Sequence, residues 1–263
     1  MVKHRDRKII RRCLQTIILS VLIMIIGYVM WPDVPKPIPT RSRVNVLRTI
    51  KQAENICGED KPWMTPNEYK LVLKYLMPEY DMLEWGAGKS SCVWSVFVKS
   101  LTSIEHNTKW ATTVMEDLQA NQDVLPVPRN KPYTNYRIRK KPSPANAYDN
   151  YIHLSELSGK KFDAILVDGR ARPQCAFEAL FMLKSINSVV FMHDYYSNIP
   201  DRRYYHVIEK WYDVVVSVPG SPGMVVLRPK KLSPNVQKEE FPTWWFENYN
   251  EEGIPILIGN SQA

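Results

Sequence analysis

The sequence predicts an α/β fold: a Rossmann-like, mostly parallel seven-stranded sheet with a terminal antiparallel hairpin, preceded by one transmembrane helix. Three observations predict this class. A glycine turn follows a short apolar segment near residue 85, several later apolar segments end in an acid, and a long apolar run without charge stands near the N-terminus.

The glycine turn joins a strand to a helix. Residues 80–85 are typical of a strand, Gly86 and Gly88 turn the backbone, and residues 91–98 can continue as a helix. Such a unit binds phosphates or nucleosides, because glycine lets a ligand approach the backbone closely. A P-loop would need glycine where Leu83 stands, and a dinucleotide site would need a third glycine or alanine where Ser91 stands.

Four predicted strands carry an acid at or near their carboxyl end. Glu84 ends the first, and the segments 101–106, 162–170 and 188–194 contain Glu105, Asp168 and Asp194 in the same place. Carboxyl ends of parallel strands meet at the edge where open α/β sheets bind ligands. Glu105 follows the glycine turn by about 20 residues, the distance at which an acid reaches ribose hydroxyls. Capping of the following helices is the alternative for some of these acids.

The sequence Glu84-x-Gly86-x-Gly88 after a first strand resembles motif I of the class I S-adenosylmethionine-dependent methyltransferases. Over residues 80–228 the chain is similar to a methyltransferase-like group with Glu-Trp/Phe-Gly-x-Gly-x-Ser, Glu-His, Val-Asp-Gly-Arg and His-Asp in that order. A terminal antiparallel strand is also a feature of that fold and is usually missing from nucleotide dehydrogenases. The layout of the whole chain resembles that of the plant glucuronoxylan methyltransferases.

The resemblance implies a binding site for S-adenosylmethionine. The residues that would hold the cofactor are Glu84, Gly86, Gly88, Ser90, Ser91 and Glu105. The serines could donate to the cofactor carboxylate from the start of the helix, and Glu105 would bind the ribose. No clear acid follows the third strand to contact the adenine amino group, and Asp149 is a late candidate only.

Catalysis is assigned to three residues at the ends of the last two parallel strands. Asp168 and Asp194 are candidates to hold Mg²⁺ or another divalent cation, since two carboxylates suit a hard cation. His193 is a candidate general base, with a structural role as the alternative. Arg170 and Arg172 could bind an acidic acceptor such as a uronate, or could be solvated loop residues.

The leading hypothesis is therefore methyl transfer to an oxygen acceptor, such as a glycan in the secretory lumen. A catalytically inactive binding or scaffold protein of the membrane is the alternative, and a nucleotide-sugar enzyme on a similar sheet is a third hypothesis.

The N-terminus predicts a membrane anchor. Residues 13–31 carry no charge, and a helix of this length spans about 28 Å, close to the hydrocarbon thickness of a bilayer. Six basic residues and one acid precede the run, which places residues 1–12 in the cytoplasm and the domain in the lumen of the Golgi or endoplasmic reticulum. A cleaved signal peptide is the alternative. Much of the formal charge of +8 lies in this flank, so no nucleic-acid partner is expected.

The rest of the chain divides into a proline-rich stem at 32–43, a methyltransferase-like domain at 44–228 and an aromatic extension at 229–263 that packs on the domain or lines an acceptor groove. Helices are expected at 44–56, from a capping box at Thr65 to Leu76, from the N-cap Asn107 to Leu118, at 173–183 and at 201–212. The third strand is placed at 135–139, and a hairpin at 213–218 and 224–227.

Cysteine use leaves the disulfide state open. Cys13 lies at the cytoplasmic membrane edge, where palmitoylation is possible. Cys57, Cys92 and Cys175 would be lumenal, and at least one of the three cannot pair within the chain. Cys92 falls inside the helix after the glycine turn, where simple packing is expected.

Overall fold

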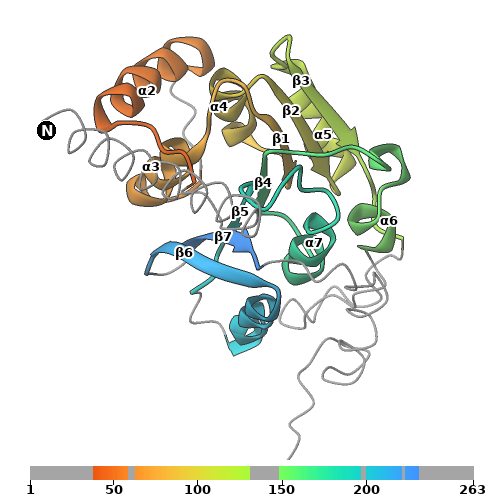
Figure 1. Cartoon of the computed structure of the whole chain (residues 1–263). Helices are drawn as coiled ribbons and strands as arrows, with labels where there is room; N and C mark the ends of the chain where they lie inside the picture. The colour runs from red at the N-terminus through yellow and green to blue at the C-terminus, as the bar shows by residue number, and fades with distance from the viewer. Residues whose placement is uncertain (1–37, 59–62, 131–147, 197–199, 221–222, 231–263) are drawn as a thin grey trace, which may run out of the picture. The chain divides into compact units, whose positions relative to one another are not determined.

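The computed structural model describes residues 38–58, 63–130, 148–196, 200–220 and 223–230 (Figure 1). Within these ranges, no helix is both long enough and apolar enough to cross a membrane. The expected cytoplasmic tail at 1–12, the expected anchor at 13–31, residues 32–37 of the expected stem and the extension from residue 231 lie outside the described residues.

The central element is a seven-stranded sheet in the order β3-β2-β1-β4-β5-β7-β6. The first five strands of that order run parallel, and β7 pairs antiparallel with both β5 and β6. The strands are β1 (Asp81–Trp85), β2 (Ser100–Glu105), β3 (Gln122–Pro126), β4 (Ala164–Val167), β5 (Val189–His193), β6 (Tyr212–Val218) and β7 (Met224–Pro229). The expected sheet with its terminal hairpin is confirmed, and the chain order reverses at β1 and β4, the type of point where such sheets bind ligands.

The sequence pattern predicted the third parallel strand at the wrong residues. The third parallel strand is Gln122–Pro126 and pairs with β2, whereas the segment predicted for it, 135–139, lies outside the described residues. Among the described strands, β3 is an edge strand with one neighbour. It therefore needs no continuous apolar run, and only Gln122 and Val124 of its five residues are buried.

The central strands of the sheet, β1, β4, β5 and β7, are buried on both faces because they are mostly apolar. One face carries Met82, Leu101, Ala164, Leu166, Val189, Phe191, Met224 and Val226. The other carries Leu83, Trp85, Ile104, Ile165, Val167, Val190, Met192, Val225 and Leu227. Alternate residues of each strand thus belong to separate cores, as the period of two in a strand requires.

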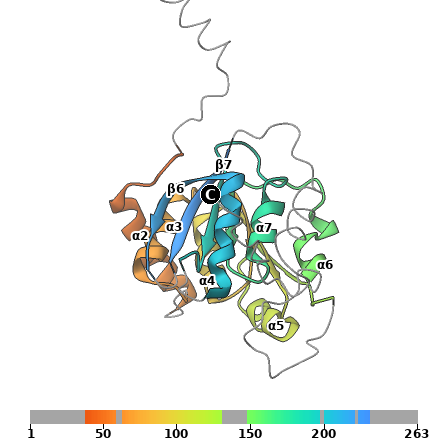
Figure 2. The ribbon, with the colours of Figure 1, turned by 90° about the horizontal axis from the view of Figure 1, so that it is seen from below.

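Helices cover each face. The first face is covered by α2 (Arg43–Cys57), α3 (Pro66–Tyr75), α4 (Lys89–Phe97) and α5 (Thr108–Glu116). The second is covered by α6 (Asp149–Ile152), η2 (Ser155–Leu157), α7 (Arg172–Ala179) and η3 (Pro200–Lys210). Figure 2 shows α2 and α3 on one side of the sheet and α6 and α7 on the other.

Most expected helices are confirmed, with two differences. The capping box of α3 forms as predicted, with Thr65 accepting from the backbone of Glu68 and Glu68 accepting from the backbone of Thr65. Asn107 caps α5 by accepting from the backbone of Trp110. However, α7 ends at Ala179, before the expected 183, and the segment expected to be helical at 201–212 is a 3-10 helix that ends at Lys210.

The domain begins before residue 44. Ile38 is buried in the first core, the backbone of Arg41 donates to the carbonyl of Lys74, and its guanidinium donates to the carbonyl of Phe97 at 3.1 Å. The last residues of the expected stem therefore pack against α3 and α4.

A disulfide joins Cys57 at the end of α2 to Cys92 in the first turn of α4, with Cα atoms 6.0 Å apart. The expectation that Cys92 is simply packed was wrong, because the end of α2 lies beside it. Cys175 is free and buried, so the odd thiol expected from the count of lumenal cysteines is this one.

Candidate active site at the carboxyl edge of the sheet

Glu84 is the buried centre of the site. Its side chain is fully enclosed at the end of β1. One carboxyl oxygen, Oε1, accepts hydrogen bonds from the hydroxyls of Ser91 and Ser103, the latter at 2.7 Å. The other oxygen, Oε2, has no hydrogen-bond partner among the described residues. Burial raises the pKa of Glu84 to about 8, although both serine hydrogen bonds lower it.

The two glycines of the turn have different roles. Gly86 has φ +102°, and a Cβ there would lie 2.7 Å from the backbone of Gly169, so the turns after β1 and β4 touch through glycine. Gly88 has an extended φ of −165° that any residue adopts. The nearest heavy atom to a Cβ at Gly88 is Ser90 Oγ at 3.9 Å, so this position offers space for a ligand above the backbone.

Ser91 connects the turn to Glu84. Its hydroxyl accepts from the backbone N–H of Gly88 at 2.9 Å and donates to Glu84. Ser90, beside it in the first turn of α4, is also buried. Ser91 therefore fixes the shape of the turn, whereas the sequence predicted a donor to the cofactor carboxylate.

Glu105 lies at the end of β2 and is buried. Its Oε1 accepts from the backbone N–H of Asn107 at 2.7 Å and lies 2.9 Å from Nδ1 of His106. His106 packs edge-to-face against Tyr148 and Tyr151, with ring centroids 5.8 Å and 5.9 Å away. An aromatic cluster thus adjoins the acid that was predicted to bind ribose.

His193 lies between two carboxylates. Its Nδ1 is 2.8 Å from Asp168 Oδ1, and its Nε2 is 3.6 Å from Oε2 of Glu68, the capping-box residue of α3. Burial lowers the pKa of His193, but the hydrogen bond to Asp168 and its charge outweigh this effect and the pKa is raised. The protonated form is therefore favoured more than in a free histidine, and in that form Nε2 would form an ion pair with Glu68 of α3. A general base would instead need an open, neutral nitrogen.

Arg172 occupies the position between the two acids that were predicted to bind metal. Its guanidinium lies 2.7 Å from Asp194 Oδ2 and 3.3 Å from Asp168 Oδ1. It also donates to the carbonyls of His193 at 2.6 Å and Gly169 at 3.1 Å. Burial lowers the pKa of Arg172, but the surrounding acids, Asp168 first, raise it overall.

These contacts do not fit a divalent cation. Both acids already neutralise one buried guanidinium, and among the described residues no group of three or more His, Cys, Asp or Glu side chains could hold a metal ion. The same contacts correct the expectation that Arg172 binds an acceptor, because its donors all face the protein. Arg170 is exposed on the same loop and keeps that role as a prediction.

Among the described residues after β3, no acid is placed to contact an adenine amino group. The residues that directly follow β3, from Val127 to Asn130, include no acid, and Asp149 is exposed in the first turn of α6. Tyr151 lies beside Gly169, in the turn after β4. Its hydroxyl lies 1.9 Å from where a Cβ of residue 169 would be, so only glycine fits there.

Sequence reasoning missed the contact of Glu68 with His193 and the pairing of Arg172 with Asp168 and Asp194. Glu68 was identified only as a capping-box residue, and no local pattern reveals that it faces β5 from another helix. Arg172 carried a weak signal, since it lies four residues after Asp168 and directly before the proline that starts a helix.

No protein-family model and no curated protein matches the sequence. Solved structures do match. A protein from Thermoplasma acidophilum is 12% identical, with a TM-score of 0.43, and the match covers 69% of this chain and 98% of that chain. A tRNA methyltransferase from Aquifex aeolicus is 16% identical with a TM-score of 0.42 and covers 68% of this chain and 76% of that chain.

The N-methyltransferase NodS from Bradyrhizobium japonicum is 10% identical with a TM-score of 0.39, and the match covers 72% of this chain and 96% of that chain. At these TM-scores the matches carry no argument about this chain. The functional proposal rests instead on the strand order and on the contacts of Glu84.

Proposed function

We propose that this chain is an S-adenosylmethionine-dependent methyltransferase that acts on an oxygen acceptor. The observation that carries the proposal is Glu84: a fully buried carboxyl with one unpartnered oxygen, beside a glycine turn with open space at Gly88. It lies at the carboxyl edge of a sheet whose terminal antiparallel hairpin agrees with the methyltransferase resemblance.

The residues at this edge fit the cofactor. An unpartnered buried carboxyl oxygen calls for a donor or a cation, which the ammonium group of S-adenosylmethionine would supply to Glu84. The space at Gly88 would allow the methionine part to approach the backbone, and Glu105 would accept hydrogen bonds from the ribose hydroxyls. When bound, the cofactor supplies a methyl group on a positively charged sulfur. The protein then has mainly to position the acceptor oxygen in line with that methyl carbon.

The acceptor hydroxyl must also lose a proton. Asp168 is the better candidate to receive it, because its side chain is 21% exposed while that of His193 is 6% exposed. In this role His193 and Arg172 would orient the carboxylate. Asp194, which is 13% exposed and paired with Arg172, would hold the guanidinium in place.

The compartment and the acceptor are part of the proposal. An anchor at 13–31 would place the domain in the lumen of the Golgi or endoplasmic reticulum, and the Cys57–Cys92 disulfide supports an oxidising compartment. An acidic glycan is the acceptor that we would examine first, with Arg170 as the exposed basic residue of the site.

Calorimetric titration of S-adenosylmethionine into the full-length chain, purified in mild detergent, tests the proposal. We expect a Kd of roughly 1–100 μM, unchanged by MgCl2 and weakened about tenfold or more by Glu105→Ala. Asp123→Ala is the matched control, because Asp123 is an exposed acid on the neighbouring strand β3. Folded protein that does not bind the cofactor would refute the proposal.

A non-catalytic binding protein is the second candidate function. One observation favours it: Asp168, His193 and Asp194 are all already paired with protein groups. Tritiated methyl transfer from the cofactor to hydroxylated acceptors, acidic glycans included, separates the two. Cofactor binding without transfer to any acceptor would support this second candidate.

A further inference from the structure

A groove on the first face of the sheet lies away from the acids at the carboxyl edge. It runs between α4 and α5 beside the end of α2 and has a volume of about 390 Å³. Its lining includes Gly88, Trp110, Glu116, Asp117 and Gln122. None of Glu84, Glu105, Asp168 and His193 lines it, and Gly88 is the residue that it shares with the proposed cofactor site.

Gln122 is the unusual residue of this groove. It is the first residue of β3, and its side chain is 6% exposed. Within the part of the chain that the structure describes, neither its amide nitrogen nor its amide oxygen has a hydrogen-bond partner. A buried amide without partners destabilises a fold, whereas the same amide is satisfied if a ligand offers both a donor and an acceptor.

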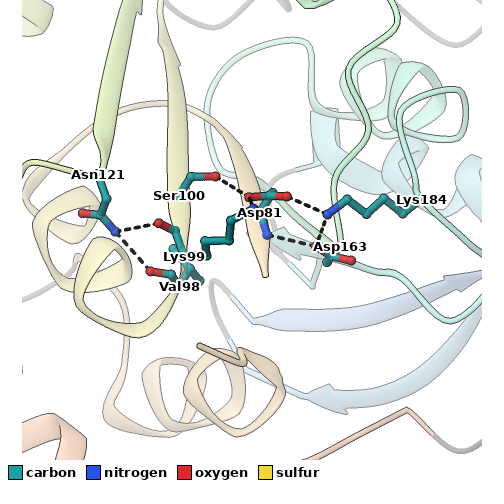
Figure 3. Close-up of polar contacts among 7 residues, drawn as sticks. All are labelled: Asp81, Val98, Lys99, Ser100, Asn121, Asp163 and Lys184. Atoms are coloured by element: carbon teal, nitrogen blue, oxygen red, sulfur yellow. Dashed lines mark hydrogen bonds and ion pairs between the residues drawn. The ribbon is translucent and has the colours of Figure 1, made fainter. Parts of the chain in front are cut away.

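The neighbouring residue shows that the position of Gln122 is fixed. The amide nitrogen of Asn121 donates to the carbonyls of Val98 at 3.0 Å and Lys99 at 3.3 Å (Figure 3). It also donates to the carbonyl of Ser95 at 2.9 Å, which holds the start of β3 against the end of α4. Gln122 is also held by register, because it pairs with Leu101 of β2. The unpartnered amide therefore belongs to a rigid part of the fold.

Trp110 adds an aromatic surface to the groove. Its indole N–H donates to the carbonyl of Ala87 at 2.8 Å, which fixes the ring. Trp63 stacks against it with centroids 6.5 Å apart and is 85% exposed. A fixed indole with an exposed partner offers an apolar face to a ligand that is otherwise polar.

The charges of the groove restrict the ligand. The carboxylates of Glu116 and Asp117 outnumber the single ammonium group of Lys89, so a phosphate or a uronate is disfavoured. Hydroxyl groups both donate and accept and can satisfy both atoms of the Gln122 amide. A pyranose ring also has an apolar C–H face that suits an indole.

We infer that this groove binds a neutral sugar residue, with the amide of Gln122 between ring hydroxyls and Trp110 against the sugar face. This site meets the proposed cofactor site at Gly88, and sugar binding at Gln122 requires no methyl transfer. It would let the domain hold a glycan chain at a second point.

Titration of maltotriose, cellotriose and chitotriose into the full-length chain, followed by calorimetry, tests the inference. We expect at least one of these neutral sugars to bind with a Kd of about 1 mM or tighter, and Gln122→Leu to weaken it about tenfold or more. The melting temperature of Gln122→Leu should equal or exceed that of wild type, because the substitution removes an unsatisfied buried amide.

Gln174→Leu is the matched control. Gln174 is a buried glutamine on α7 whose amide oxygen also has no partner, but it lies against the other face of the sheet. Its substitution should leave sugar binding unchanged. The inference is overturned if none of the three sugars binds, if Gln122→Leu binds as well as Gln174→Leu, or if adenosine binds at Gln122 in place of the sugars.

Discussion

Strand β1 carries two acids three residues apart, and these differ in burial and in hydrogen-bond partners at the two edges of the sheet. Asp81 stands at the amino edge, where Oδ2 accepts from Lys184 at 2.6 Å and Oδ1 accepts from Ser100 at 2.7 Å. Asp163 of the adjoining segment shares Lys184 at 2.7 Å (Figure 3). Glu84, at the carboxyl edge, is fully buried and has one oxygen without a partner.

The pKa values show what this difference means. Hydrogen bonds from Lys184 and Ser100 lower the pKa of Asp81 to about 2, while burial raises the pKa of Glu84 to about 8. At neutral pH the first acid stabilises the fold by its charge. The second costs stability, as expected of a group whose partner is a ligand rather than the protein.

Arg172→Met should produce the largest effect, because it removes the cation shared by Asp168 and Asp194 at the carboxyl edge. Removing one partner of a buried ion pair typically costs about 3–5 kcal/mol. Urea unfolding at pH 7 measures the change. Arg170→Met, on the exposed arginine of the same loop, should change the unfolding free energy by less than about 0.5 kcal/mol. Equal stability of the two variants would show that Arg172 does not stabilise these acids.

Glu84→Gln should remove a stability cost that grows with pH. The pKa of Glu84 is about 8 in the folded protein and about 4.3 in an unfolded chain. Between these values the unfolded chain loses the proton first, so the wild-type unfolding free energy falls as pH rises, by up to about 1.4 kcal/mol per pH unit from this group.

Glu84→Gln removes this titrating group. The unfolding free energy of the variant relative to wild type should therefore rise from pH 5 to pH 8, by roughly 2–4 kcal/mol in total. Urea unfolding across this range measures the difference. The same variant should bind the cofactor more weakly, because a neutral amide oxygen accepts a hydrogen bond from an ammonium group but supplies no opposite charge. A difference that stays constant with pH would mean that Glu84 ionises as an ordinary carboxyl.

Loss of the Cys57–Cys92 disulfide tests whether α4, which begins at the glycine turn, depends on α2 for support. The bridge closes a loop with a sequence separation of 35, and such bridges contribute about 2–4 kcal/mol. The double variant with Cys57→Ser and Cys92→Ser should melt at a lower temperature than wild type. Dithiothreitol should lower the melting temperature of wild type and leave that of the variant unchanged. An unaltered melting temperature of wild type in dithiothreitol would show that the disulfide does not stabilise the fold.

The sequence was sufficient for the parts of the fold that repeat a pattern. The glycine turn, the strands that end in Glu84, Glu105 and Asp168, and the terminal hairpin follow from local periodicity and turn chemistry. The edge strand β3 was misplaced because a strand with one neighbour can be short and half exposed, which leaves little pattern to read.

The contacts of the site depend on segments that meet only in the folded chain. Glu68 lies on α3 and reaches His193 on β5, and Arg172 at the start of α7 reaches Asp194 after β5. No spacing in the sequence encodes these distances. The residue types at the edge were therefore predictable, whereas their pairing, and with it the case against a metal ion, was not.

Asp81→Asn should give the smallest effect, with a pH dependence opposite to that of Glu84→Gln. The pKa of Asp81 is lowered to about 2 from an ordinary value of about 3.9. Its stabilising charge is fully present above the ordinary value and is lost as pH falls through the folded value.

Because Lys184 is 37% exposed, solvent screens its pair with Asp81. We therefore expect Asp81→Asn to lower the unfolding free energy by about 1 kcal/mol or less at pH 7. This loss should disappear toward pH 2 and shrink in high salt. Asp123→Asn, an exposed acid on β3, is the control. Asp81→Asn could instead gain stability relative to wild type as pH rises, as Glu84→Gln should. In that case the two acids of β1 would not differ electrostatically, and there would be no basis for assigning a ligand to Glu84 and none to Asp81.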